Sequence, residues 1–303
     1  MKIDFKDQVA IVTGAGNGLG RSHALALAER GAKVVVNDLG GDVTGAGSNS
    51  TAAEEVVALI KQNGGQAFAH PANVADFEQV QDMVAQAMQK WGRVDILVNN
   101  AGILRDKTFA KMELDDFKLV MDVHLMGTVN CCKAVWQIMR DQNYGRIVVT
   151  TSSSGMYGNF GQSNYGAAKM AVLGLMNTLV LEGAKNNIKV NALSPTAATR
   201  MTEGLIPEEA FKLMTIESVT AGLLTLCHDQ APNRMILCAG AGGYASTRLF
   251  ETDGIYLKPD QQTPENIVKN MDGICDISNQ AELAHGGKQT EKFIMKAMAA
   301  LQV

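Results

Sequence analysis

The sequence lacks the cysteine pattern of a disulfide-bonded or zinc-binding protein, and it lacks a surplus of basic residues. Its five cysteines form no C-x-x-C pair and are odd in number, which argues against a disulfide framework and a structural zinc site. Lys and Arg together number 27 and Asp and Glu 31, so no excess positive charge can neutralise a nucleic-acid backbone. We therefore expect reduced thiols, no metal and no nucleic-acid partner.

Targeting and membrane-spanning segments are also missing. The first residues lack the apolar stretch of a signal peptide, and no run of about 18 consecutive apolar residues is available to span a membrane. The last three residues, Leu301, Gln302 and Val303, do not match the Ser-Lys-Leu peroxisomal signal. The sequence thus predicts a cytoplasmic protein that has no membrane partner.

Short runs of β-branched residues alternate with longer segments of helical period. The runs fall at residues 9–13, 34–36, 96–98, 147–150, 188–191 and 235–237. Continuous apolar strands of this kind are typical of a parallel sheet that is covered on both faces. Because 46% of the 303 residues are apolar, the chain can also fill a large core. We predict an α/β fold of the Rossmann type, a doubly wound and mostly parallel sheet with helices on both faces.

The pattern of the sequence changes after residue 243. Gly and Pro punctuate short polar stretches until a last amphipathic helix, in which Phe293, Ile294 and Met298 share one face. We expect residues 1–243 to form the sheet domain. Residues 244–303 are then a C-terminal extension that packs on this domain or on a neighbouring subunit.

A glycine-rich loop connects the first expected strand to the first helix. Its spacing is G-x-x-x-G-x-G, with Gly14, Gly18 and Gly20 at the fixed positions and Asn17 and Leu19 between them. Such glycines let the backbone approach a pyrophosphate, which then sits at the positive N-terminus of the helix. We expect these five residues to bind a dinucleotide in the sheet domain. The alternative is a plain strand-to-helix turn.

The second expected strand is followed by Asp38, about twenty residues after the glycine loop. A carboxylate there can accept hydrogen bonds from both hydroxyls of the adenosine ribose, and it repels a 2′-phosphate by about 4 kcal/mol at a separation of about 4 Å. Neither Asn17 nor Leu39 offers a compensating positive charge. Asp38 therefore predicts NAD rather than NADP, unless it is only a turn residue.

Three residues suggest the chemistry. Tyr165 and Lys169 lie one helical turn apart, and Ser152 precedes them at the end of an expected strand, where ligands bind in open α/β sheets. A nearby Lys⁺ and a positively charged nicotinamide would lower the pKa of the phenol from about 10. Tyr165 can then take the proton of an alcohol as hydride leaves the same carbon, while Ser152 donates to the carbonyl oxygen that forms. Lys169 can also bind the nicotinamide ribose.

Together these motifs resemble those of the short-chain dehydrogenase/reductase family. The glycine loop, Asp38, the string Asn-Asn-Ala-Gly at residues 99–102, Ser152 and the Tyr-x-x-x-Lys pair occur in the family's order and spacing. Similarity to the (3R)-hydroxyacyl-CoA dehydrogenase part of type 2 peroxisomal multifunctional enzymes extends to residues 37–42, 100–106, 157–162 and 263–276. The resemblance covers essentially the whole chain.

The resemblance implies an NAD-dependent oxidation of a (3R)-hydroxyacyl-CoA to the 3-oxoacyl-CoA in β-oxidation, carried out by a homodimer. A separate enoyl-CoA hydratase would act in the same pathway. Oxidation of a hydroxysteroid or of a steroid side-chain acyl-CoA needs the same chemistry and stays open. A 3-oxoacyl-carrier-protein reductase would draw on NADPH, which Asp38 disfavours. The intact Ser152, Tyr165 and Lys169 speak against a nucleotide-binding scaffold without turnover.

The resemblance also implies roles for residues outside these motifs. Asn73 and Val74 are expected beside the adenine, although the family usually has Asp at the position of Asn73. Most family members have Asn, the fourth catalytic residue, at the position of His124. His124 either substitutes for that Asn or is an ordinary polar residue of a long helix. The remaining candidates, which line the cofactor groove or meet the nicotinamide amide, are Asn99, Ala101, Gly102, Thr196, Ala198 and Thr199.

Two further features leave alternatives open. Arg105, Lys107 and Arg200 are candidate contacts for a CoA phosphate or else solvated surface charges. The Gly- and Ser-rich residues 42–49 are either a mobile loop or an edge of the cofactor or dimer surface.

Overall fold

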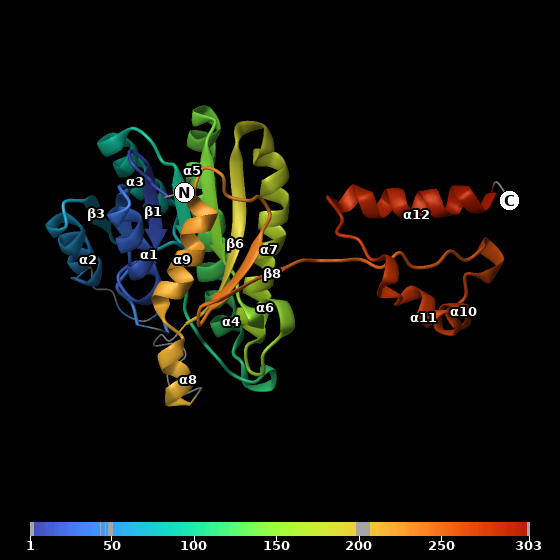
Figure 1. The fold of residues 1–303 in the computed structure, drawn as a ribbon. Helices are drawn as coiled ribbons and strands as arrows, with labels where there is room; N and C mark the ends of the chain where they lie inside the picture. The colour runs from blue at the N-terminus through green and yellow to red at the C-terminus, as the bar shows by residue number, and fades with distance from the viewer. Residues whose placement is uncertain (1–2, 43, 46, 48–50, 198–206, 302–303) are drawn as a thin grey trace. The chain divides into compact units, whose positions relative to one another are not determined.

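A computed structural model describes residues 3–42, 44–45, 47, 51–197 and 207–301 (Figure 1). Its centre is an eight-stranded sheet of order β3-β2-β1-β4-β5-β6-β7-β8. The strands are β1 (Val9–Thr13), β2 (Lys33–Asn37), β3 (Gln66–His70), β4 (Ile96–Asn99), β5 (Gly145–Thr150), β6 (Ile188–Thr196), β7 (Ile236–Gly240) and β8 (Gly243–Thr247). Strands β1 to β7 pair in parallel, which confirms the predicted fold class.

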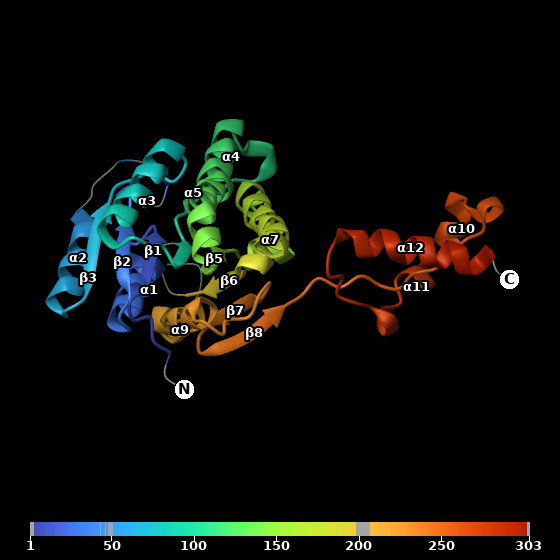
Figure 2. The ribbon, with the colours of Figure 1, turned by 90° about the horizontal axis from the view of Figure 1, so that it is seen from above.

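Helices cover both faces of this sheet (Figure 2). One face carries α1 (Gly18–Glu29), α2 (Thr51–Gln62) and α9 (Ile216–Cys227). The other carries α3 (Phe77–Trp91), α5 (Gly127–Gln142) and α7 (Ser163–Gly183). Shorter helices within the same unit are α4 (Leu114–Met121), α6 (Ser153–Tyr157) and α8 (Glu208–Leu213).

The core consists of two apolar layers, one on each side of the sheet. Alternate residues of a strand point to opposite faces, so Ala10 and Val12 of β1 join the layer under α1, while Ile11 joins the layer under α5. All three side chains are fully buried. Burial on both faces explains why the central strands are continuous apolar runs rather than alternating ones.

The strand order places the predicted site residues at one edge of the sheet. The order reverses at β1, which lies between β2 and β4, and ligands of open α/β sheets bind beyond the carboxyl ends of the strands at such a switch point. The glycine loop follows β1, Asp38 follows β2, residues 100–102 follow β4 and Ser152 follows β5. The fold therefore brings these segments together.

Strand β8 follows β7 after a two-residue turn at Ala241 and Gly242. Both residues have positive φ, at 48° and 77°, which is the geometry of a tight hairpin turn and reverses the chain direction. Alanine tolerates this conformation poorly, whereas asparagine adopts it with less strain. We predict that Ala241→Asn raises the free energy of unfolding by about 0.5–1 kcal/mol, measured by denaturant titration. An unchanged or lower value would count against this account of the turn.

The chain divides into two compact units after Ser246. The second unit contains α10 (Pro264–Lys269), α11 (Met271–Ile274) and α12 (Gly286–Leu301). Within it, Lys292 of α12 pairs with Glu251, and Lys296 pairs with Asp253 at 2.6 Å. The boundary expected from the sequence, after residue 243, lies at the start of β8, and the division after Ser246 lies near the end of the same strand.

One helical stretch, Ser163–Asn186, is long and apolar enough to cross a membrane by length and composition alone. Its residues Val172, Leu173 and Met176 are at most 1% exposed and pack in the core layer beneath the sheet. We therefore interpret it as a core helix.

Candidate active site

The glycine loop is shaped by the close approach of two backbone segments. A Cβ atom on Gly14 would lie 2.8 Å from the Cα of Ala101, and one on Gly20 would lie 2.1 Å from the carbonyl oxygen of Gly14. Only glycine fits at these two positions. Asn17 precedes α1 without capping it through its side chain, so the first N–H groups of the helix are left for an anion. The loop fits the pyrophosphate of a dinucleotide.

Asn100 and Thr13 fasten the glycine loop to the end of β4. The Nδ2 of Asn100 donates to the carbonyl oxygens of Thr13 and Gly14, at 3.0 Å each. The Oγ1 of Thr13 accepts from the N–H groups of Asn100 and Ala101, also at 3.0 Å. The prediction of the site from sequence missed both residues as positioning groups. The Asn-Asn-Ala-Gly string was the available signal for Asn100.

Asp38 lies beside the same loop, and two backbone N–H groups hold its carboxylate. Its Oδ2 accepts from Gly16 and its Oδ1 accepts from Gly40, both at 2.7 Å. A Cβ on Gly16 would come within 2.8 Å of Oδ2, so glycine leaves the room that the carboxylate occupies. The fixed anion fits a ribose with free hydroxyls and opposes a 2′-phosphate.

The segment expected beside the adenine follows β3. The Nδ2 of the buried Asn37 donates to the carbonyl oxygens of His70 and Ala72, at 3.0 and 2.9 Å, and so fixes this segment to β2. The Oδ1 of Asn73 accepts from the N–H of Ala75 at 3.0 Å. Val74 is buried. The hydrogen bonds thus hold the chain next to Asp38.

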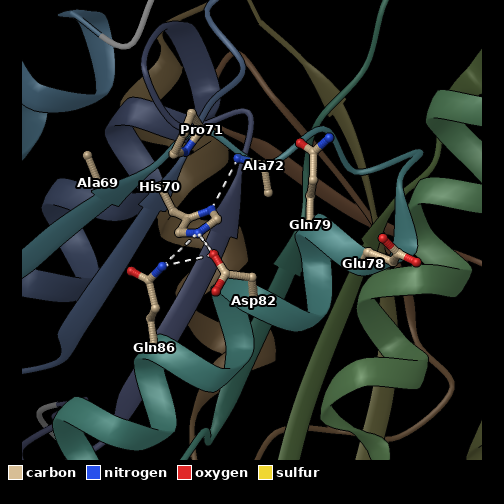
Figure 3. Close-up of a pocket in the computed structure, with 8 residues that line it drawn as sticks. All are labelled: Ala69, His70, Pro71, Ala72, Glu78, Gln79, Asp82 and Gln86. Atoms are coloured by element: carbon tan, nitrogen blue, oxygen red, sulfur yellow. Dashed lines mark hydrogen bonds and ion pairs between the residues drawn. The ribbon is translucent and has the colours of Figure 1, made fainter.

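A pocket of about 540 Å³ lies at the end of β3 (Figure 3). The N–H of Ala72 donates to Nδ1 of His70 at 3.2 Å, so the other ring nitrogen carries the hydrogen and donates to Asp82 at 3.0 Å. Gln86 also donates to Asp82, at 2.9 Å. The residues that line the pocket come from β3, the segment after it and α3, and none is a predicted catalytic residue. We therefore place the candidate active site elsewhere.

Ser152, Tyr165 and Lys169 come together at the carboxyl end of β5. Ser152 precedes α6, and the other two residues lie in the first two turns of α7. The side chain of Ser152 is close enough to the hydroxyl of Tyr165 to lower the pKa of the phenol. The Nζ of Lys169 lies 5.5 Å from the centre of the Tyr165 ring and donates to the carbonyl oxygen of Thr150 at 2.7 Å. An alcohol, a phenol and an amine thus share one site.

Burial controls the charge of this site. Lys169 is only 4% exposed, and desolvation lowers its pKa to about 7. Burial also raises the pKa of Tyr165, and the nearby side chain of Ser152 opposes this shift in part. The sequence predicts a lowered pKa for the phenol from the charge of Lys169, but in the chain itself desolvation has the larger effect. A cation next to the phenol would be needed to reverse the shift.

His124 lies against Tyr165. It belongs to a π-helical segment, Asp122–Met126, and its ring meets that of Tyr165 edge-on at 5.1 Å between centroids. Its Nε2 lies 3.1 Å from the nitrogen and 2.8 Å from the oxygen of the Ile103 backbone. Burial, followed by the charge of Lys169, holds the pKa of His124 well below its usual value, so the ring is neutral. Its Nδ1 is buried and has no hydrogen-bond partner among the described residues.

The other predicted residues have varied surroundings. The side chain of Asn99 donates to the Sγ of Cys132 at 3.6 Å. A Cβ on Gly102 would lie 2.3 Å from the His124 ring. Thr196, at the end of β6, is exposed. Ala198, Thr199 and Arg200 lie outside the described residues.

Arg105 and Lys107, the candidate phosphate contacts, both pair with Asp116. The nitrogen–oxygen distances are 3.0 Å and 3.1 Å. The positive charges are thus partly neutralised by this carboxylate, which weakens the hypothesis that they bind CoA. In the part of the chain that the structure describes, no group of three or more His, Cys, Asp or Glu side chains is placed to hold a metal ion.

Comparison with known proteins identifies the family. Residues 8–210 match the short chain dehydrogenase family. The chain is 46% identical over 281 residues to the peroxisomal multifunctional enzyme type 2 of Mus musculus, which covers 92% of this chain and 38% of that protein. It is 48% identical over 280 residues to the peroxisomal multifunctional enzyme A of Dictyostelium discoideum. This match covers 92% of this chain and 62% of that protein. The chain therefore spans only part of the length of these relatives.

Solved structures give the same result. The full-length peroxisomal multifunctional enzyme type 2 of Drosophila melanogaster has a TM-score of 0.82 and 36% identity, covering 99% of this chain and 51% of that one. A 7α-hydroxysteroid dehydrogenase complexed with NADH and 7-oxo glycochenodeoxycholic acid matches with a TM-score of 0.71 and 30% identity. This match covers 79% of this chain and 95% of that one. The expected resemblance to the type 2 multifunctional enzymes is confirmed.

The prediction of a cytoplasmic location is wrong. The relatives are peroxisomal enzymes by name, and they overturn it. The prediction rested on the cysteines and on three missing features: a signal peptide, a membrane-spanning run and the Ser-Lys-Leu ending. Reduced thiols do not distinguish the cytoplasm from another reduced compartment, and three residues test a single targeting signal. The comparisons do confirm the predicted enzyme class. The chain belongs to the short-chain dehydrogenase family of oxidoreductases.

Proposed function

We propose that the protein oxidises the 3-hydroxyl of a (3R)-hydroxyacyl-CoA to the 3-oxo group, with NAD as hydride acceptor. The convergence of Ser152 and Tyr165 at the end of β5, next to the buried Lys169, carries this proposal. The identity to peroxisomal multifunctional enzymes, whose (3R)-hydroxyacyl-CoA dehydrogenase part the sequence resembles, supports the acyl-CoA substrate. We further propose that the protein is a homodimer and that a separate enoyl-CoA hydratase supplies its substrate.

Each residue of the site has a separate role in the proposed reaction. Bound NAD supplies the acceptor for the hydride that leaves C3 of the substrate. Tyr165 takes the proton of the 3-hydroxyl at its phenolic oxygen, and Ser152 donates a hydrogen bond to the oxygen that becomes the carbonyl. Lys169, when protonated, favours the phenolate through its positive charge. The glycine loop would hold the pyrophosphate and Asp38 the adenosine ribose.

We propose that His124 acts as a positioning residue in this reaction. The Nε2 of its neutral ring makes one hydrogen bond to the Ile103 backbone next to Tyr165: it donates to the C=O if it carries the hydrogen and accepts from the N–H if it does not. An Asn amide can replace either of these hydrogen bonds, whereas Leu can replace neither. We expect His124→Leu to lower kcat by about 10-fold or more and His124→Asn to lower it less. Equal kcat values for both variants and the wild type would contradict this role.

A hydroxysteroid is the second candidate substrate. The 7α-hydroxysteroid dehydrogenase shares the fold at 30% identity, and its chemistry also needs only a secondary alcohol beside nicotinamide. A 3-oxoacyl-carrier-protein reductase is disfavoured by the carboxylate of Asp38, because that reaction would draw on NADPH.

A substrate panel tests the proposed function. The purified protein is assayed for NADH formation with (3R)-hydroxyacyl-CoAs of several chain lengths and with hydroxysteroids, and for NADPH consumption with a 3-oxoacyl carrier protein. The proposal predicts the highest kcat/KM for an acyl-CoA. A higher value for a steroid or a carrier-bound substrate would refute it.

A further inference from the structure

Asn164 is a fully buried polar residue directly before Tyr165. It lies in the first turn of α7 and is 0% exposed. A buried amide is costly unless its donors and acceptors are paired, so its partners show what the side chain does.

Both ends of the Asn164 amide are paired. Its Oδ1 accepts from the backbone N–H of Tyr165 at 2.7 Å, and its Nδ2 donates to the carbonyl oxygen of Arg105 at 3.0 Å. The opposite orientation of the amide would set N–H against N–H and oxygen against oxygen, so only one orientation fits. The side chain therefore links the residue that carries the phenol to a segment 59 positions earlier in the chain.

That segment is held firmly. The side chain of Arg105 donates to the carbonyl oxygen of Thr44 at 2.7 Å and pairs with Asp116 at 3.0 Å. Two further hydrogen bonds join the same stretch of chain to the residues before α7. The N–H of Lys107 donates to Gly161 at 2.9 Å, and the side chain of Gln162 donates to Asp106 at 2.7 Å.

The contacts thus hold Tyr165 from two sides. His124 holds Ile103 and meets the Tyr165 ring, while Asn164 holds the carbonyl of Arg105 and the Tyr165 backbone. Both contacts connect Tyr165 to the same segment after β4, which contains Ile103 and Arg105. Asn164 itself is too deeply buried to touch a substrate.

We propose that Asn164 is a positioning residue that sets the place of the Tyr165 phenol relative to Ser152 through the carbonyl of Arg105. The inference rests on the proposed function, in which Tyr165 takes the substrate proton. Small displacements of a reacting group reduce the chemical step far more than they reduce binding. Loss of the Asn164 amide therefore lowers kcat and leaves NAD binding in place.

The test compares Asn164→Ala with a matched control, Asn186→Ala. Asn186 also donates to a backbone carbonyl, that of Arg140 at 3.3 Å, but it lies just beyond the opposite end of α7. We measure kcat with (3R)-hydroxyacyl-CoA, the Kd for NAD and Tm for both variants. Asn164→Ala is expected to lower kcat by about 10- to 100-fold, with the Kd for NAD within about twofold of the wild type. Asn186→Ala is expected to keep wild-type kcat.

The outcomes separate this inference from the proposed function. A wild-type protein that oxidises no (3R)-hydroxyacyl-CoA refutes the function. An active wild type together with an Asn164→Ala variant of equal kcat refutes the inference. So does a loss of kcat that Asn186→Ala reproduces at the same drop in Tm, because the effect is then only structural.

Asn164→Asp replaces Asn164→Ala as the test variant if the alanine variant does not fold. It keeps the size of the side chain and the acceptor for the Tyr165 N–H, but it sets an oxygen against the carbonyl of Arg105. We expect the same loss of kcat at unchanged Kd for NAD. Wild-type kcat in this variant would overturn the inference.

Discussion

Tyr165→Phe is expected to lower kcat by about 10²- to 10⁴-fold while the Kd for NAD changes little. The substitution removes only the phenolic oxygen, which interacts with the side chain of Ser152 and is the proposed proton acceptor. The ring and its edge-on contact with His124 remain, so the site keeps its shape. Steady-state kinetics gives kcat, and a titration of the variant with NAD gives the Kd.

Tyr144→Phe is the matched control for this prediction. The hydroxyl of Tyr144 donates to Asp229 at 2.7 Å, and Tyr144 directly precedes β5, at the end of that strand opposite Ser152. Loss of the Tyr144 hydroxyl is expected to lower the free energy of unfolding and to leave kcat unchanged. A Tyr165→Phe variant that keeps more than a tenth of the wild-type kcat would show that another group takes the proton.

Asp38→Asn is expected to raise the ratio of kcat/KM for NADP over NAD by about 10²- to 10³-fold. A repulsion of about 4 kcal/mol between the carboxylate and a 2′-phosphate corresponds to about 10³-fold at most. Because Asn has nearly the size of Asp, the change in the cofactor ratio reflects mainly the loss of the negative charge of Asp38. The ratio is measured from initial rates with each cofactor at a saturating concentration of acyl-CoA.

Asp82→Asn is the control for the cofactor prediction. This variant removes the same charge from α3, where Asp82 pairs with His70 in the pocket of Figure 3. We expect its cofactor ratio to match that of the wild type. If Asp38→Asn also leaves the ratio unchanged, Asp38 does not select the cofactor.

Most of the sheet could be predicted from the sequence, because its central strands are buried on both faces. The β-branched runs mark β1, β2, β4, β5, β6 and β7 directly. Strand β3 was missed, because its sequence Gln-Ala-Phe-Ala-His contains one strand-favouring residue. Pairing with β2 along its whole length, together with the amide of Asn37, holds it in place. Strand β8 was missed because its side chains are mostly exposed and carry no apolar pattern.

The candidate site could be predicted only where its motifs are local. Tyr165 and Lys169 are one helical turn apart, and the glycine loop is a single short segment. Asn100 stands in a local motif, but its role and that of Asn164 could not be found in this way, because each donates to a carbonyl oxygen that is 59 or more positions distant in the sequence. The shifted pKa of Lys169 depends on burial, which no short motif specifies.

The most direct test of the proposed function is a comparison of two stereoisomers of one substrate. Purified protein is given the (3R)- and the (3S)-hydroxyacyl-CoA of the same chain length, with saturating NAD, and the initial rate of NADH formation is measured. We expect rapid NADH formation with the (3R) isomer and at least a 100-fold lower rate with the (3S) isomer, a difference of about 2.7 kcal/mol between the two transition states. Equal rates, or no NADH from either isomer, would contradict the proposal.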